Sequence, residues 1–177
     1  MTLTVSRSSH ADLALRNRLQ ELGLRLPDLP PAAGSYLPAV RSGSIVHTSG
    51  QLPIVSGSLL SVGKVGGEIT QAEAAELART CALNALAAAA TVADLDSIVR
   101  ILKVTVFVAS APGFNRQAQV ANGASELLET IFDSGHARSA VGVAELPLNA
   151  PVEIELVAEV RGGVADENGP DNCSPAG

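Results

Sequence analysis

The amino-acid sequence predicts an α+β fold in which two long helices lie on one face of a mixed sheet. Residues 70–90 and 114–132 carry apolar side chains at helical spacing. Residues 151–160 alternate between apolar and mostly acidic side chains, which is typical of a strand with one buried face. The predicted order along the chain is hairpin, helix, strand, helix, hairpin, and this order favours an α+β domain.

Residues 1–33 form a lead before the main domain, which we assign to residues 34–162. Residues 1–10 are expected to be mobile. Leucines recur at helical spacing over 11–22, and Gly23 is suited to end this helix. Residues 26–38 are rich in proline, which fixes φ and lacks an N–H, so this segment should run extended along a surface.

The main domain should begin with a hairpin. Strands 39–41 and 45–49 flank a tight turn at residues 42–44, Ser-Gly-Ser. Residues 54–68 are rich in Gly and Ser and hold either a short strand or an open loop. Thr70 and Glu73 fit a capping box, so a helix should begin there and end near Ala90. Its many alanines suit close packing on a sheet.

The second half of the domain combines a long strand, a helix and a closing hairpin. Residues 98–109 are β-prone and apolar on both faces apart from Lys103 and Thr105, so they predict a central strand that is covered on both sides. After the helix over 114–132, strands 138–146 and 151–160 are joined by a turn at 147–150 and read as a hairpin. Residues 163–177 are polar and predict a disordered tail. The inward stripe of the helix comprises Val120, Ala124, Leu127, Leu128 and Ile131.

One face of the predicted sheet has nothing in this chain to cover it. We expect Ala140, Gly142, Ala144 and Thr105 to make this face small and semi-polar. Because both long helices are used on the other face, a second copy of the chain is expected to cover it. The sequence therefore predicts a homo-oligomer.

Composition limits the partners of the protein. The chain has 177 residues, 46% of them hydrophobic and only 2% aromatic, with a net charge of −6. An acidic chain with few aromatic rings gives no reason to expect binding to nucleic acid or to an anionic membrane surface. The start of the chain has no secretory signal, and the longest apolar stretch, 81–93, is too short to span a bilayer. We therefore expect a cytoplasmic protein.

Cysteine and histidine are not spaced as metal ligands. Cys81 lies on the apolar side of a predicted helix and Cys173 in the polar tail, with no CxxC motif between them. The three histidines, His10, His47 and His136, are far apart and are interpreted as surface or packing residues. We expect neither a metal nor a disulfide.

Arg138 and Glu153 are the leading candidates for a functional pair. Each stands near the start of one strand of the predicted closing hairpin, which would bring the two side chains toward a common region. A planar cation can hold a small carboxylic acid, and a carboxylate acceptor can position a water against it. The alternative is a structural salt bridge on a sheet face.

Four segments resemble the RidA family, also called YjgF/YER057c/UK114, in the family's own order. The motifs that carry the resemblance are the SGQ that ends the second strand, the KVTVFV strand and the ARSAVGVAELP segment. The four segments, residues 34–53, 66–90, 101–109 and 137–160, are spread over nearly all of 34–160. The resemblance implies a chorismate-mutase-like fold and a homotrimer, in which three sheets face a central barrel and clefts lie between neighbouring subunits. The N-terminal lead is similar to that of a longer, less characterised branch and could cover the cleft.

For its best-known members, the family implies hydrolysis of reactive 2-imino acids to 2-oxo acids and ammonia. By position, Arg138 matches the arginine that clamps the substrate carboxylate, and Glu153 matches the acid that positions the attacking water. Glu155 and Glu159 share the face of Glu153, so a register shift would exchange them. An imine carbon is already electrophilic, and the reaction needs no metal, nucleotide, flavin or other cofactor.

Four further residues match cleft positions of the family. Tyr36 matches a tyrosine near the cleft, although a lone tyrosine also packs against a sheet in many proteins. Gly50 would offer main-chain contact beside the ligand. Asn122 matches a cleft asparagine, with simple solvent exposure as the alternative. Ala140 stands where many members have a cysteine, so the chain lacks a thiol that hydrolysis does not need.

Two other functions compete with imine hydrolysis. A non-catalytic trimer could use Arg138 to bind small 2-oxo acids. An endoribonuclease, the activity historically attached to the family's name, fits the acidic charge and the shortage of aromatic residues least well.

Overall fold

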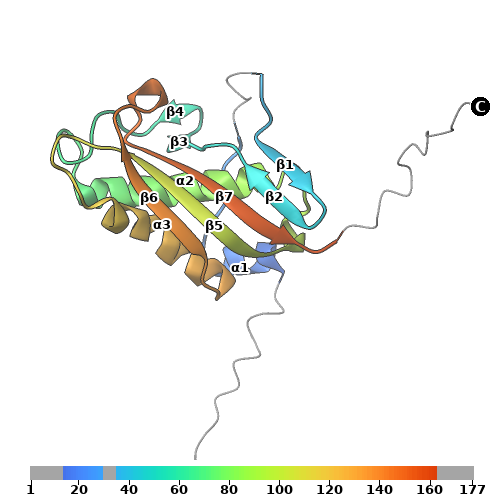
Figure 1. Cartoon of the computed structure of the whole chain (residues 1–177). Coiled ribbons are helices and arrows are strands. Elements are labelled where there is room, and N and C mark those ends of the chain that lie inside the picture. Colours follow the sequence, from blue (N-terminus) through green and yellow to red (C-terminus); the bar gives the residue numbers. More distant parts are fainter. Residues whose placement is uncertain (1–13, 30–34, 163–177) are drawn as a thin grey trace, which may run out of the picture.

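The computed structural model describes residues 14–29 and 35–162. The predictions for the mobile start, for the disordered tail and for His10 and Cys173 fall outside these residues. Figure 1 shows the elements. In chain order they are α1 Leu15–Glu21, β1 Ala39–Ser42, β2 Ile45–Thr48, β3 Ile54–Val55, β4 Ser58–Leu59, α2 Gln71–Ala89, η1 Leu95–Ser97, β5 Ile98–Ala109, α3 Gln117–Phe132, β6 Ala137–Val143, η2 Pro147–Asn149 and β7 Val152–Val160.

The predicted fold class is confirmed. Five strands form one mixed sheet in the order β1-β2-β7-β5-β6, and only the β5–β6 pair is parallel. Helices α2 and α3 lie side by side on one face of this sheet (Figure 1). The core lies between these two layers. Alternate residues of β7 point into it, and the predicted inward stripe of α3 is buried against them.

The start of α2 and the end of α1 form where local chemistry predicts them. The Thr70 hydroxyl accepts from the Glu73 N–H at 3.2 Å, while the Thr70 N–H donates to the Glu73 carboxylate at 2.8 Å, which completes the capping box of α2. At the end of α1, Gly23 has φ +66° and its N–H donates to the Gln20 carbonyl. The Leu24 N–H donates to the Leu19 carbonyl, so the two bonds form a Schellman motif.

The predicted closing hairpin is wrong. Strands β6 and β7 do not pair, because β5 lies between them, parallel to β6 and antiparallel to β7. The connection over 144–151 contains the 3-10 turn η2, and Leu148 and Asn149 both have φ +58° there. The apolar strand β5 thus occupies an interior position of the sheet, where both of its edges find hydrogen-bond partners. Because β6 and β7 follow each other along the chain, the sequence favoured a hairpin between them. The strand order is instead decided by the placement of the apolar β5 between these two strands.

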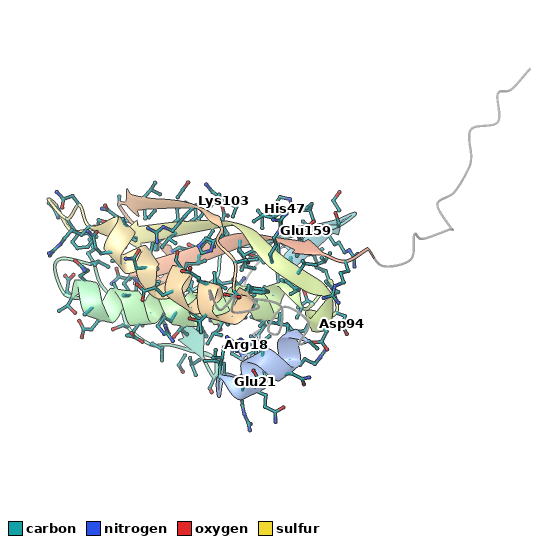
Figure 2. All side chains as sticks on the ribbon, turned by 90° about the horizontal axis from the view of Figure 1, so that it is seen from below. Arg18, Glu21, His47, Asp94, Lys103 and Glu159 are labelled. Carbon is teal, nitrogen blue, oxygen red and sulfur yellow. The ribbon has the colours of Figure 1, made fainter. Side chains whose placement is uncertain are left out.

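The second face of the sheet is open in the described chain, although its composition differs from the prediction. Register pairs Ala140 with the buried Val106, so Ala140 lies on the helix side of the sheet and packs against the core. The open face carries Lys103, Thr105 and Phe107, and β5 is therefore buried on one side only. Figure 2 shows Lys103, His47 and Glu159 on the side of the sheet that faces away from α1.

Candidate functional site

Arg138 lies near the start of the edge strand β6, and its side chain reaches helix α3. One guanidinium nitrogen, Nη1, donates to Asn122 Oδ1 at 2.9 Å and to Ser125 Oγ at 3.0 Å. Asn122 and Ser125 are three residues apart on α3 and so lie on one face of the helix. Strand β6 pairs with β5 and contacts α3, which packs on the face of the sheet toward which Arg138 points.

The guanidinium has no acidic partner among the residues that the structure describes. Both of its contacts are neutral oxygens, and each takes one of the two hydrogens of Nη1. The opposite edge of the group, formed by Nε and Nη2, has no hydrogen-bond partner within residues 14–29 and 35–162. A half-buried arginine with one free donor edge is suited to two parallel hydrogen bonds with a carboxylate.

His136 lies behind this pair. Its Nε2 atom is 3.0 Å from Ser125 Oγ, while its Nδ1 atom is buried without a partner in the described part of the chain. Burial lowers the pKa of His136 below its ordinary value of 6.5, and the nearby charge of Arg138 lowers it further. Sequence reasoning took His136 for a surface or packing residue and missed Ser125. The shared helix face of Asn122 and Ser125 was the signal that could have pointed to it.

Glu153 forms a second cluster, with Gly50, at another part of the sheet. A Cβ atom on Gly50 would overlap the Glu153 carboxylate, so only glycine allows this close approach. The chain after Gly50 is held beside β7, because Gln51 and Ile154 exchange two backbone hydrogen bonds of 2.8 and 3.0 Å. Burial raises the pKa of Glu153 above its ordinary value of 4.5, and the neighbouring charge of Glu155 raises it further.

Tyr36 lies on the same side of the molecule as Gly50. The Ser49 hydroxyl donates to the Leu37 carbonyl at 2.6 Å, and the Ser49 N–H donates to the Pro38 carbonyl, so the segment that holds Tyr36 runs beside Gly50. The side chain of Tyr36 is 51% exposed. It is therefore free to contact a ligand or another copy of the chain.

Arg138 and Glu153 do not meet within one chain. On β5, the residue paired with Arg138 is Val104. The residue paired with Glu153 is Phe107, three residues further along β5. Their strands are also two positions apart in the sheet, so their Cα atoms are roughly 14 Å apart. Arg138 is on the helix side with the buried Val104, whereas Glu153 is on the open side. The described chain thus carries two separate groups of candidate residues, which we call half-sites: one with Arg138, Asn122 and Ser125, and one with Tyr36, Gly50 and Glu153.

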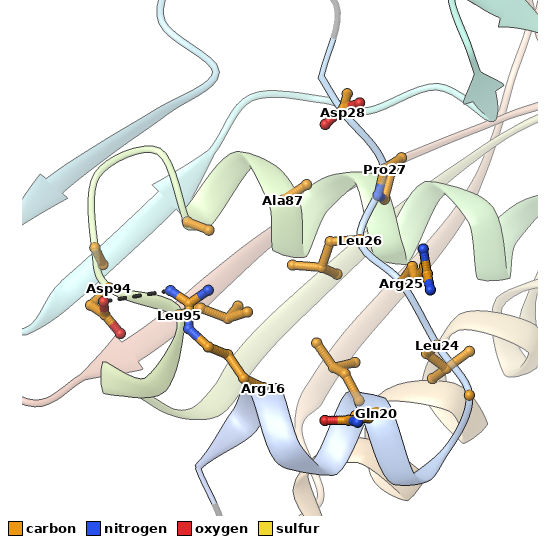
Figure 3. A pocket seen from close by; sticks show the side chains of 14 residues that line it. Arg16, Gln20, Leu24, Arg25, Leu26, Pro27, Asp28, Ala87, Asp94 and Leu95 are labelled. Carbon is orange, nitrogen blue, oxygen red and sulfur yellow. Dashed lines mark ion pairs between the residues drawn. The ribbon is translucent and has the colours of Figure 1, made fainter.

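A cavity of the described chain lies elsewhere. It has a volume of about 1020 Å³ and is lined by α1, the segment after it, the end of α2 and η1 (Figure 3). An ion pair between Arg16 and Asp94 spans 3.6 Å across its edge. The described part of the lead thus packs on the helix layer, and neither Arg138 nor Glu153 lines this cavity.

Other chemistry is limited in the described residues. Burial raises the pKa of the Cys81 thiol well above its ordinary value, so this sulfur stays protonated. No group of three His, Cys, Asp or Glu side chains in the described ranges could hold a metal ion. Nor is any helix in these ranges long and apolar enough to cross a membrane.

Comparison with known proteins identifies the family of the chain. Residues 27–160 match the family model described as Endoribonuclease L-PSP, and the chain belongs to this family, which is the RidA/YjgF family. The predicted resemblance is thus confirmed.

Three relatives illustrate the range of names in this family. Protein TCP17 of Trypanosoma cruzi is 42% identical over 147 residues, which cover 81% of this chain and 92% of the relative. The mitochondrial protein MMF1 of Saccharomyces cerevisiae is 36% identical, with 73% and 77% covered. TdcF of Escherichia coli K12, named as a reactive intermediate deaminase, is 32% identical, with 73% and 89% covered.

Solved structures agree with the fold. The protein Atu1372 of Agrobacterium tumefaciens, of unknown function, has a TM-score of 0.75 and 42% identity, covering 84% of this chain and 94% of its own. TdcF of Escherichia coli with bound serine has a TM-score of 0.57 and 28% identity, covering 78% and 99%.

Proposed function

We propose that the protein hydrolyses reactive 2-imino acids to 2-oxo acids and ammonia, in a site that two neighbouring copies complete. The observation that carries this proposal is the guanidinium of Arg138, which has a free donor edge and no acidic partner among the described residues. The deaminase name of TdcF and the serine bound in its structure support a small substrate with a carboxylate. In a homotrimer, the edge strand β6 of one copy, which carries Arg138, would lie beside the open sheet face of the next copy, which carries Glu153.

The reaction needs three things from this chain. Arg138 holds the substrate carboxylate by two hydrogen bonds and thereby orients the imine carbon. Glu153 accepts a proton from water as the water oxygen bonds to that carbon. This proton passes to nitrogen and gives a carbon that bears both a hydroxyl and an amino group. The hydroxyl proton then also passes to nitrogen as C=O forms and the C–N bond breaks, and a 2-oxo acid and ammonia leave.

The environment of Glu153 suits this role. Because burial and the charge of Glu155 raise its pKa, the carboxylate of Glu153 is a stronger base than an ordinary glutamate. Tyr36 and Gly50, which share the half-site of Glu153, are proposed to contact the substrate. Ala140, two residues from Arg138, packs against the core. Because it stands where many family members have a cysteine, the proposed site has no reactive sulfur at this position.

A trapping assay tests hydrolysis directly. An amino-acid oxidase acting on alanine generates 2-iminopropanoate, and semicarbazide traps whatever imine survives. We expect the protein to lower semicarbazone formation and Arg138→Ala to abolish this effect. Arg79→Ala is the matched control, because Arg79 lies on α2 and pairs only with Glu76 among the described residues.

Mixing two inactive variants tests the shared site. Arg138→Ala and Glu153→Gln each damage a different half-site, so a mixed trimer would rebuild some intact sites. Random assembly at equal amounts should restore about a quarter of wild-type activity. If the two variants, unfolded and refolded together, stay inactive, both half-sites of each copy serve the same cleft and the proposal of a shared site is wrong.

A non-catalytic binder of 2-oxo acids is the second candidate, because the free edge of Arg138 would bind a carboxylate without any chemistry. Pyruvate binding together with unchanged imine decay would favour it. Endoribonuclease names also occur in the family, but the net charge of −6 weighs against an RNA substrate. A cytoplasmic location stays a prediction, and the mitochondrial name of MMF1 is a reason to test it.

A further inference from the structure

We infer that Ser125, aligned by His136, is a positioning residue that selects which edge of the Arg138 guanidinium faces the substrate. This inference rests on the proposed function, because it concerns the same carboxylate clamp. It adds two residues that neither the sequence motifs nor the family resemblance had singled out.

The geometry of Arg138 defines what Ser125 does. A guanidinium has two donor edges that fit a carboxylate, one formed by Nε and Nη2 and the other by Nη1 and Nη2. Asn122 Oδ1 and Ser125 Oγ both take hydrogens of Nη1, at 2.9 and 3.0 Å. With both hydrogens of Nη1 engaged, only the Nε–Nη2 edge can hold a carboxylate by two parallel bonds. One acceptor alone would leave a hydrogen of Nη1 free and the group able to turn.

His136 determines the direction of the Ser125 hydroxyl. Because the oxygen accepts from a cation on one side, its own hydrogen is best directed to an acceptor on the other side. Nε2 of His136, at 3.0 Å, is that acceptor when the ring is neutral and carries its proton on Nδ1. The charged groups that act on the ring are Arg138 on β6 and Glu129 on α3. Burial and Arg138 together keep the ring neutral.

Binding of pyruvate, measured by calorimetry, separates this inference from the proposed function. Ser125→Ala should weaken binding about tenfold, the effect of losing roughly one hydrogen bond to a charged group. Ser125→Thr keeps the hydroxyl and should restore most of the affinity. Ser134→Ala is the matched control, because the Ser134 hydroxyl is buried without a partner among the described residues and should not affect binding.

A double-mutant comparison shows whether the effect passes through Arg138. In an Arg138→Ala background, Ser125→Ala should change the residual binding less than twofold, because no guanidinium remains to be positioned. Wild-type affinity in Ser125→Ala would overturn the inference and leave the proposed function standing. Absence of both pyruvate binding and imine hydrolysis in the wild-type protein would instead overturn the proposed function.

Nitrogen NMR of the His136 ring gives a readout that a merely structural serine would not change. We expect a neutral ring at pH 7 with its proton on Nδ1, and a change in the Nε2 shift in Ser125→Ala. A ring protonated on Nε2, or one whose Nε2 does not respond to the substitution, contradicts the proposed alignment.

Discussion

Replacing Gly123 by alanine should destabilise the protein, although alanine is the better helix former. Gly123 is buried in α3 where this helix crosses α2. A Cβ atom there would overlap the carbonyl oxygen of Ala75 and lie 2.7 Å from its carbonyl carbon. The obstacle is backbone, which cannot rotate out of the way as a side chain could. The two helices must therefore move apart.

Two opposing terms set the magnitude. Alanine gains about 1 kcal/mol over glycine in a helix interior. Overpacking of a close-packed core costs about 1–3 kcal/mol, and the backbone contact at Ala75 favours the upper end. The net loss is about 2 kcal/mol, which lowers the melting temperature by about 4–8 °C for a chain of this length.

Thermal unfolding of Gly123→Ala and wild type at equal protein concentration measures this loss. Gly135→Ala is the control, since a Cβ there meets no atom within 4 Å, and it should change the stability by less than about 0.5 kcal/mol. Asn122 and Ser125 are close to Gly123 on α3, so pyruvate binding should weaken as well. A Gly123→Ala protein that melts at or above the wild-type temperature would refute the reasoning from close helix approach.

Three further predictions concern the half-sites. Arg138→Lys should lower kcat/KM for 2-iminopropanoate by about 10- to 100-fold in the trapping assay, because a single ammonium cannot replace a two-bond clamp; wild-type kinetics would argue against the clamp. Glu153→Gln should abolish hydrolysis, and in wild type kcat/KM should fall on acidification with a midpoint above pH 4.5, the ordinary glutamate value. Because the pKa of Glu153 is higher in the folded than in the unfolded chain, protonated Glu153 stabilises the fold. This contribution is lost as the pH rises from 4.5 to the pKa of the folded protein. Glu153→Gln should therefore melt at a higher temperature than wild type at pH 7 but not at pH 4. Gly50→Ala should displace the Glu153 carboxylate and lower kcat, and an unchanged kcat would contradict a role for Glu153 with water.

The elements were predictable where local chemistry determines them. The strand over Ile98–Ala109 was predicted to the residue, because its β-branched composition ends sharply at both sides. The start of α2 followed from the reciprocal bonds of Thr70 and Glu73. Helix α3 begins at Gln117, three residues after the predicted start, because Phe114 and Arg116 belong to the turn before it.

The site was predictable in its residue types but not in its arrangement. The sheet order separates Arg138 and Glu153 by the intervening strand β5, and the register of β6 and β7 on β5 places the two side chains on opposite faces of the sheet. No local pattern carries that information, because strand order depends on which strand gains most from burial between two others. Ser125 and His136 were missed for a related reason: each looks ordinary alone, and only the approach of α3 to β6 brings them to Arg138.

By itself, the sequence determined the elements, the α+β class, the family and the two charged residues on which the proposed chemistry depends. Secondary-structure propensity, helix capping and the alternation of apolar and polar side chains act over a few residues, and a family motif consists of residues that are adjacent in the sequence. All of them can therefore be read without the structure. Only the tertiary structure decided the order of the strands, the separation of Arg138 from Glu153 and the contact of Arg138 with Ser125. Those features come from packing between segments far apart in the chain, where burial outweighs local preference.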